Sequence, residues 1–309
     1  MERSFHLQDV RIRDACILPD AATQTYYLCT SIRPSEGGSR PGVGVYTSQD
    51  LIEWSGPHIA FEVPADFWGQ EGIWAPELHA YRGRYYLFLT INTNDPIAEP
   101  QPGWLPRVKR GSQVLVGDAP RGPFRPFRNR AHLPVEWMTL DGTLWVEDGV
   151  PYMVYCHEWV QIKDGTVEVV RLTDDLSDIV GEPTVLFHGS DAPWSTGSRT
   201  YPGSYVTDGP FLYRTRTGTL LMVWSSFISG AYATGVAVSE TGKLHGPWRQ
   251  EPEPLFAEDG GHAMIFRRFD GGLMLVLHQP NQPPNERARL FELEDTGDSI
   301  RIARAWTDG

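Results

Sequence analysis

Five similar segments recur along this chain at nearly regular spacing. Each is a short run of aromatic and aliphatic residues, the composition of a buried β-strand. Most of them follow a turn signal, such as Arg82-Gly83 or Asp148-Gly149. A repeat of this kind restricts the fold more than any other feature, because one supersecondary unit must then be copied five times. The segments are TYYLCTS (25–31), RYYLFLT (84–90), PYMVYCH (151–157), LLMVWSS (220–226) and LMLVLHQ (273–279).

Each of these segments lies between two further predicted strands, so each repeat offers at least three strands. In two repeats the third strand leads to a Gly-Pro-aromatic closing signal, at 121–124 and 245–248. The preceding strands are predicted at 13–20, 74–81, 140–147, 207–214 and 261–268. The following strands are predicted at 42–51, 112–120, 167–176, 234–241 and 288–295.

The repeat length identifies the fold class. Matching polar residues near the start of each first strand are separated by 63, 64, 67 and 54 residues. A period near 60 residues with three or four strands per unit predicts an all-β chain, a five-bladed β-propeller that occupies residues 1–309 as a single domain. The matching residues are Asp14, Glu77, Asp141, Asp208 and His262.

A two-domain α/β protein is the alternative for a chain of this length. It requires amphipathic helices of about ten or more residues between the strands, and the sequence contains no convincing one. The sequence leaves open whether the segment SFHLQDVRI (4–12) forms the outer strand of the last blade and so closes the ring.

Charge and composition restrict the partners. The chain has 27 Lys and Arg against 39 Asp and Glu, for a formal net charge of −12. This balance argues against nucleic acid, which needs a basic surface, and is compatible with a neutral sugar. Cys16, Cys29 and Cys156 are expected to be buried, reduced thiols. The N-terminus has no signal-peptide pattern and no run is long enough to cross a membrane, so we expect a cytoplasmic protein without a membrane partner.

The propeller topology predicts where a site lies. The first strand of each blade lines the central channel, and the antiparallel second strand returns to the same rim. Strand starts and the connections after second strands therefore converge on one funnel, where crowded carboxyl groups must differ in proton affinity. Glycoside hydrolysis needs such a pair, with one carboxylate ionised as base and one carboxylic acid still protonated. An Asp-Gly pair is also common in ordinary turns. The prediction of a catalytic site therefore depends on finding three aspartates at the same position of the repeat.

Other residues near the predicted rim are candidates for binding an oligosaccharide. Aromatic side chains there can stack on a sugar face, although tryptophans are more often core residues. Polar residues at the ends of second strands can bond to hydroxyl groups, as can polar residues near the first-strand starts. The candidates are Trp74, Glu77, His157, Glu158, Trp224, His262 and His278.

The chain resembles glycoside hydrolase family 43, the five-bladed arabinofuranosidases, β-xylosidases and arabinanases, over essentially its whole length. The resemblance implies an inverting hydrolase acting on α-L-arabinofuranosyl or β-D-xylosyl linkages. By position, Asp14 resembles the general base, Asp141 the residue that tunes and orients the acid, and Asp208 the general acid. The motifs that carry the resemblance are RDACI (13–17), WAPEL (74–78), YYLF (85–88), LDGTL (140–144), DGP (208–210) and GH (261–262).

One residue departs from the family pattern. Relatives usually carry Glu-Gly-Pro where this chain has Asp208-Gly209-Pro210, and the shorter side chain falls short by about one bond length, on the order of 1.5 Å. The blade can shift so that Asp208 remains the acid, Glu158 can supply the acid, or the protein can bind glycans without hydrolysing them. A purely structural propeller is a further alternative. We expect an exo-acting hydrolase, with a slight preference for arabinose linkages.

The resemblance also bears on cofactors. Arabinan-cleaving relatives hold a calcium or sodium ion near a central histidine, which His262 matches by position. Such hard ions prefer oxygen ligands, so water is expected to mediate contact with the imidazole. The expected reaction does not require the ion.

Overall fold

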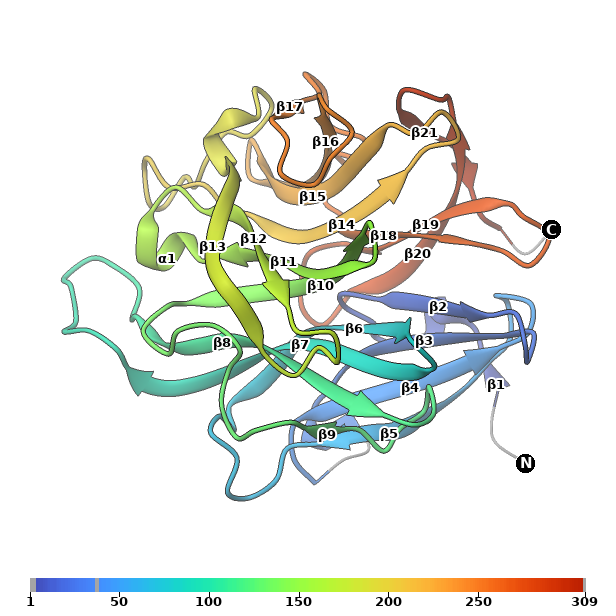
Figure 1. Cartoon of the computed structure of the whole chain (residues 1–309), viewed down its shortest axis with the longest axis horizontal. Coiled ribbons are helices and arrows are strands. Elements are labelled where there is room, and N and C mark those ends of the chain that lie inside the picture. The colour runs from blue at the N-terminus through green and yellow to red at the C-terminus, as the bar shows by residue number, and fades with distance from the viewer. Residues whose placement is uncertain (1–3, 37–38, 308–309) are drawn as a thin grey trace.

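The computed structural model describes residues 4–36 and 39–307, and most of them lie in antiparallel strands. The strands form five separate sheets. The innermost strands of the sheets contact one another in a closed cycle, so the sheets surround a central axis. In Figure 1 the sheets follow one another from blue to red, and the last lies beside the first. The fold is the predicted five-bladed β-propeller.

Each blade pairs its strands in chain order from the centre outward, apart from β1. Blade 1 contains β2 (Cys16–Asp20), β3 (Thr25–Ile32), β4 (Gly42–Ser48), β5 (Trp54–Glu62) and β1 (Ser4–Phe5), and blade 2 contains β6 (Gly72–Tyr81), β7 (Arg84–Pro96), β8 (Val108–Gly117) and β9 (Arg125–Pro126). Blade 3 contains β10 (Thr139–Glu147), β11 (Val150–His157), β12 (Thr166–Leu172) and β13 (Ile179–His188). Blade 4 contains β14 (Asp208–Arg214), β15 (Leu220–Ile228), β16 (Ala231–Ser239) and β17 (Trp248–Gln250), and blade 5 contains β18 (Gly261–Arg267), β19 (Leu273–Gln279), β20 (Arg287–Asp295) and β21 (Ile300–Ala305).

Helical structure is short in the described residues. It comprises α1 (Trp159–Ile162) and the 3-10 turns η1 (Leu7–Asp9), η2 (Pro34–Glu36) and η3 (Gly189–Asp191). Within the described ranges, no helix has the length and apolar character needed to cross a bilayer. The absence of long helices in this part of the chain agrees with the rejection of an α/β architecture.

The N-terminal segment does not join the last blade, which corrects the arrangement left open above. Ser4–Phe5 pairs with β5 of blade 1, while β21 from the local β20–β21 hairpin already covers the outer edge of blade 5. The ring closes instead through polar contacts between blade 5 and the approach to β2. The backbone N–H of Ile12 donates to the carbonyl of Glu286 at 3.1 Å. Arg11 Nε donates to the buried Glu286 carboxylate at 3.2 Å.

The interior between blades is apolar and contains the three cysteines. Cys16, Cys29 and Cys156 are buried free thiols, as predicted. Leu28 and Leu87, on the second strands of blades 1 and 2, are fully buried in the cluster that contains Cys16 and Cys29, and Cys156 lies in a second cluster. Packing of this kind fixes each inner strand against its neighbours, so the residues at the strand starts are held on a rigid frame.

Candidate active site

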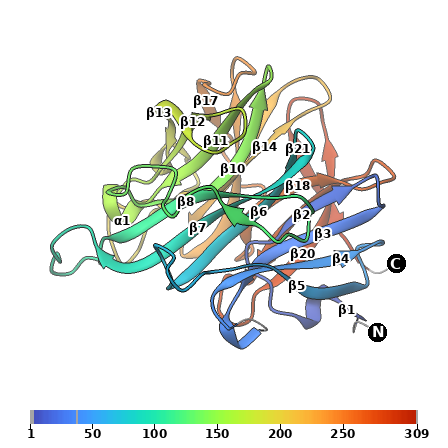
Figure 2. The same ribbon diagram turned by 60° about the horizontal axis from the view of Figure 1, so that its bottom comes forward.

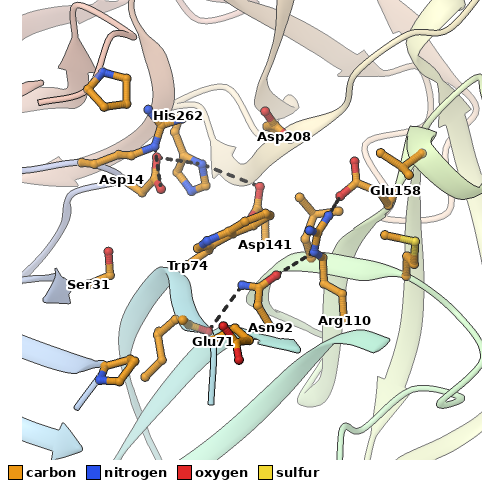
Figure 3. Close-up of a pocket in the computed structure, with 18 of the residues that line it drawn as sticks. Asp14, Ser31, Glu71, Trp74, Asn92, Arg110, Asp141, Glu158, Asp208 and His262 are labelled. Carbon is orange, nitrogen blue, oxygen red and sulfur yellow. Dashed lines mark hydrogen bonds and ion pairs between the residues drawn. The ribbon is translucent and has the colours of Figure 1, made fainter. Parts of the chain in front are cut away.

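A cavity of about 1000 Å³ opens at one end of the propeller and is lined by residues from all five blades. Figure 3 shows carboxylates and a histidine gathered around it, with Asp14 and Glu158 on opposite sides and Asp141 between them. The predicted convergence of strand starts and second-strand connections is therefore present. The predicted site residues that line the cavity are Asp14, Trp74, Asp141, Glu158, Asp208 and His262.

A recurring backbone feature turns these side chains into the cavity. In every blade a residue near the start of the inner strand has positive φ: 51° at Asp14, 43° at Ala75, 56° at Asp141, 51° at Gly209 and 54° at His262. In blades 2 to 5 the register shifts beside that residue, as in a β-bulge. A bulge re-aims a side chain out of the regular alternation of a strand. The five positions are therefore structurally equivalent.

Asp14 lies among cationic and imidazole groups. Its carboxylate is 3.1 Å from His278 Nδ1, 3.5 Å from His262 Nδ1 and 3.6 Å from Arg13 Nε. Burial alone would raise the pKa of Asp14. His262, Arg13 and His278 together hold it well below its ordinary value. Asp14 is thus an ionised carboxylate facing the cavity, the state that a general base requires.

Asp141 lies between the other two aspartates. Its Oδ2 accepts a hydrogen bond from the backbone N–H of Gly209 at 3.0 Å and lies 3.7 Å from His262 Nδ1. Burial raises the pKa of Asp141 well above its ordinary value, and the negative charge of Asp14 adds to the effect. The Gly209 bond ties Asp141 to the residue that follows Asp208, so the two side chains keep a fixed relation.

The pKa of Asp208 is shifted in the opposite direction to that of Asp14. Burial, and then the charges of Asp141 and Glu158, raise the pKa of Asp208 to about 8. The Tyr232 hydroxyl donates a hydrogen bond to Asp208 Oδ2 at 2.9 Å. Asp208 therefore retains its proton at neutral pH while Asp14 does not, which is the division that acid–base hydrolysis uses.

His262 occupies the centre of the site and explains the glycine after Asp208. A Cβ on Gly209 would meet the His262 ring at 2.9 Å, so only glycine allows the ring to pack there. The backbone N–H of His262 donates to Ser225 Oγ at 2.8 Å. His262 is thereby held within reach of both Asp14 and Asp141.

Glu158 forms an ion pair with Arg110 on the cavity wall. Arg110 also donates through Nε to Asn92 Oδ1 at 2.7 Å, and its guanidinium lies 4.1 Å from the centroid of the Trp74 ring. Trp74 is 41% exposed, so the indole remains open to the cavity. Figure 3 shows Arg110 linking Asn92 to Glu158. This arrangement fixes the position of the Glu158 carboxylate, whose charge acts on Asp208.

Four of the predicted substrate-binding residues lie outside the cavity lining, and we correct those predictions. Glu77 is buried two residues beyond the bulge, with Oε2 2.9 Å from His79 Nε2. His157 is buried and stacks on Trp137, outside the cavity. Trp224 is fully buried, 5.1 Å from the Trp194 ring. The fourth is His278.

His278 was predicted to bind substrate at the rim, but it lies buried against Asp14. It is fully buried, with Nδ1 near Asp14 and Nε2 3.2 Å from Asn281 Oδ1. Its ring stacks on Tyr232, with centroids 5.6 Å apart. Because it contacts Asp14 and does not line the cavity, His278 is placed to orient the carboxylate.

The ion expected near His262, with contact through water, stays a prediction. Across residues 4–36 and 39–307, no three His, Cys, Asp or Glu side chains form an arrangement that could hold a metal. His262 Nδ1 instead faces the carboxylates of Asp14 and Asp141. Direct binding by these side chains does not fit, and no step of the chemistry below uses an ion.

The sequence reasoning missed three residues that shape the site. Tyr232 contacts the carboxyl group of Asp208, and Arg110 holds Glu158. Arg13 lies beside Asp14 in the sequence, and that adjacency was the available signal. Tyr232 lies on β16, two strands from Asp208 in blade 4, and Arg110 lies on β8, one blade away from Glu158. No local motif marks these partners.

Replacing Tyr232 by Phe is expected to lower kcat/KM by roughly tenfold on substrates with poor leaving groups, because a hydrogen bond to an ionisable group is lost. That bond also lowers the pKa of Asp208, so its loss raises this pKa and moves the basic limb of the pH profile upward. The pH dependence of kcat/KM measures both effects. A loss of activity with an unmoved basic limb would argue that Tyr232 has only a packing role.

The geometry defines a class of protein. A cavity at the centre of a propeller holds one ionised carboxylate, one protonated carboxylic acid and a third aspartate between them. A base on one side of a glycosidic bond and an acid on the other are the requirements for hydrolysing it. The fold and site together are those of a glycoside hydrolase.

Comparison with known proteins identifies the family. The model of glycosyl hydrolases family 43 matches residues 10–309, so the chain belongs to that family. The structure of the endo-arabinase from Bacteroides thetaiotaomicron VPI-5482 superposes with a TM-score of 0.82 and 40% identity, over 99% of this chain and 98% of that one.

More distant relatives occur among solved structures and among curated proteins. The α-L-arabinofuranosidase structure from Lactobacillus brevis has a TM-score of 0.73 at 18% identity, over 96% of this chain and 97% of that one. Alpha-L-arabinofuranosidase 43 from Humicola insolens is 22% identical over 275 residues, which are 81% of this chain and 52% of that protein. The chain thus spans about half the length of this curated relative.

Proposed function

We propose that the protein is an inverting hydrolase of α-L-arabinofuranosyl linkages in arabinan-type oligosaccharides. The observation that carries the proposal is that one cavity is lined by two aspartates with different pKa values. The pKa of Asp14 is lowered and that of Asp208 is raised. The similarity to an endo-arabinase at 40% identity favours arabinose over xylose linkages. Asp14 deprotonates a water molecule, which attacks the anomeric carbon from one face. Asp208 gives its proton to the departing glycosidic oxygen.

Asp141 has a supporting role in this proposal. It accepts the N–H of Gly209 and adds to the field that raises the pKa of Asp208. Glu158 contributes in the same direction. We assign the acid to Asp208 rather than Glu158, because Glu158 is ion-paired with Arg110 and a general acid needs a transferable proton. Tyr232 holds the shorter aspartate in place where relatives usually have glutamate.

Hydrolysis should stop as the acid loses its proton. Asp208 has a raised pKa of about 8, so its protonated form prevails below that pH and disappears above it. We therefore expect kcat/KM on linear arabino-oligosaccharides, whose leaving oxygen needs a proton, to fall as the pH rises through about 8. A basic limb near the ordinary pKa of aspartate would contradict the assignment.

A substrate panel and product analysis test the reaction itself. The arabinofuranoside and linear arabino-oligosaccharides are expected to be hydrolysed faster than the matched xyloside, and NMR of the fresh product should show the inverted anomer. A retained anomer would contradict the inverting mechanism. Faster hydrolysis of the xyloside would contradict the substrate preference.

Glycan binding without hydrolysis is the second candidate, because the acid position holds the shorter Asp208. Calorimetry with arabino-oligosaccharides distinguishes it from the first. Tight binding without turnover of any panel member would support it and would overturn the hydrolase proposal.

A further inference from the structure

Six apolar residues of the cavity lining form what we call the apolar wall. Elsewhere the lining mixes polar residues, among them Arg13, Asn92 and Glu286, with apolar ones, among them Ile32, Met138 and Leu140. The apolar wall comes from the β7–β8 connection, the start of α1 and the segments beside β14 and at the end of β15. Figures 1 and 2 both show the β7–β8 connection and α1 on the same side of the molecule. The wall consists of Leu105, Pro106, Trp159, Val160, Val206 and Phe227.

The apolar wall adjoins the acid. Val206 lies two residues before Asp208, and Phe227 lies two residues after Ser225, the strand partner of Asp208. Figure 3 shows Asp208 apart from Asp14, on the side toward Glu158, with His262 beside Asp14. A general acid contacts the oxygen of the departing group, so the part of the substrate beyond that oxygen lies on the acid's side. The apolar wall therefore faces the leaving group.

Trp159 is the aromatic ring in this wall that the neighbouring loops hold in place. Its ring centroid lies 5.9 Å from that of Trp104 and 5.5 Å from that of Tyr201. Trp104 Nε1 donates to the carbonyl of Val160 at 2.7 Å, which fastens the β7–β8 connection to α1. Trp159 nonetheless remains only half-buried and lines the cavity. A ring fixed before binding loses little conformational entropy when a ligand packs on it.

We propose that Trp159 and the apolar wall form a subsite for the leaving-group sugars of an oligosaccharide. The inference rests on the proposed function, because it uses the assignment of Asp208 as acid. An indole ring offers a flat apolar surface to the C–H face of a sugar. A cavity of about 1000 Å³ has room for several sugar units. The subsite makes the protein select oligosaccharides, whose leaving group is itself a sugar chain.

Replacing Trp159 by Ala tests the subsite. We expect kcat/KM for arabino-oligosaccharides of three or more units to fall by about tenfold, because the stacking surface is removed. For 4-nitrophenyl α-L-arabinofuranoside, whose leaving group is a single small ring, the change is expected to stay within about twofold. Trp159→Phe keeps an aromatic surface and should recover part of the oligosaccharide activity.

Trp306→Ala is the matched control. Trp306 is also a half-buried tryptophan, but it packs under Arg268, 4.5 Å from the ring centroid, outside the cavity. It is expected to leave the ratio of oligosaccharide to aryl glycoside activity unchanged. Equal losses on both substrates in Trp159→Ala would show a general disturbance of the site and would overturn the subsite. No loss on either substrate would overturn it as well.

A binding measurement separates failure of the subsite from failure of the proposed reaction. In the Asp14→Asn background, calorimetry with arabinotriose measures binding without turnover. We expect the added Trp159→Ala change to weaken binding by about tenfold. If the wild-type protein hydrolyses nothing while this weakening is seen, the subsite stands and the reaction fails. If hydrolysis occurs and binding is unchanged, the subsite fails alone.

Discussion

Replacing Asp14 by Asn is expected to lower kcat on 4-nitrophenyl α-L-arabinofuranoside by about 10³-fold. The amide has nearly the same shape as the carboxylate but cannot take a proton from water. The structure makes Asp14 the group suited to this step, since His262, Arg13 and His278 hold its pKa well below the ordinary value. In the reaction it must remain ionised beside protonated Asp208. Steady-state rates with an activated leaving group isolate the loss of the base, because such a group needs little help from an acid.

Asp174→Asn is the matched control for the Asp14 variant. Asp174 is 74% exposed and pairs with Arg82 at the surface, so its replacement should leave the rate within about twofold. Circular dichroism and sugar binding establish that the Asp14 variant is folded. Full activity in a folded Asp14→Asn protein would remove the base from the mechanism.

The propeller could be predicted from the sequence because the pattern of apolar strands recurs in every blade. Apolar central strands such as 84–90 and 151–157 fall within the observed β7 and β11. Burial between blades requires such residues in every copy, so each copy repeats the signal. The N-terminal strand was harder, since Ser4–Phe5 makes a two-residue pairing that leaves almost no pattern.

Much of the site could be predicted from the repeat phase, although Asp208 lies one residue before Gly209, the equivalent backbone position of its blade, and still lines the cavity. Asp14, Asp141 and His262 lie at positions with positive φ, and all three line the cavity. Glu77 was matched to them, but the equivalent residue is Ala75. A bulge inserts a residue and reverses which side chains face inward, and no local composition announces it.

The direction in which a strand residue points explains why Trp224 does not line the cavity as predicted. Trp224 and Ser225 are adjacent on β15, yet Trp224 packs in the core while Ser225 accepts the N–H of His262. Successive residues of a strand face opposite sides, so placing Trp224 near the rim was not enough to place its ring. Contacts between blades, such as the Gly209 bond to Asp141, depend on tertiary structure and have no sequence signature.

Replacing Asp208 by Asn should produce a loss that depends on the leaving group. We expect kcat/KM on arabino-oligosaccharides to fall by about 10³-fold, because the departing sugar oxygen receives no proton. On 2,4-dinitrophenyl α-L-arabinofuranoside the loss is expected to be about tenfold or less, since this leaving group departs as a stable anion. The basic limb near pH 8 should disappear from the profile, because the group that titrates there is gone.

Glu158→Gln decides between the two candidate acids. The negative charge of Glu158 raises the pKa of Asp208, so its removal should lower that pKa and move the basic limb to lower pH, with hydrolysis retained. Loss of oligosaccharide activity in Glu158→Gln, with sparing of the dinitrophenyl substrate and no effect of Asp208→Asn, would transfer the acid role to Glu158. Because Arg110 is paired with Glu158 and Tyr232 with Asp208, we expect the opposite result. The acid is then the residue at the start of β14, and the charge of Glu158 adds to the effect of burial on the pH at which it stops working.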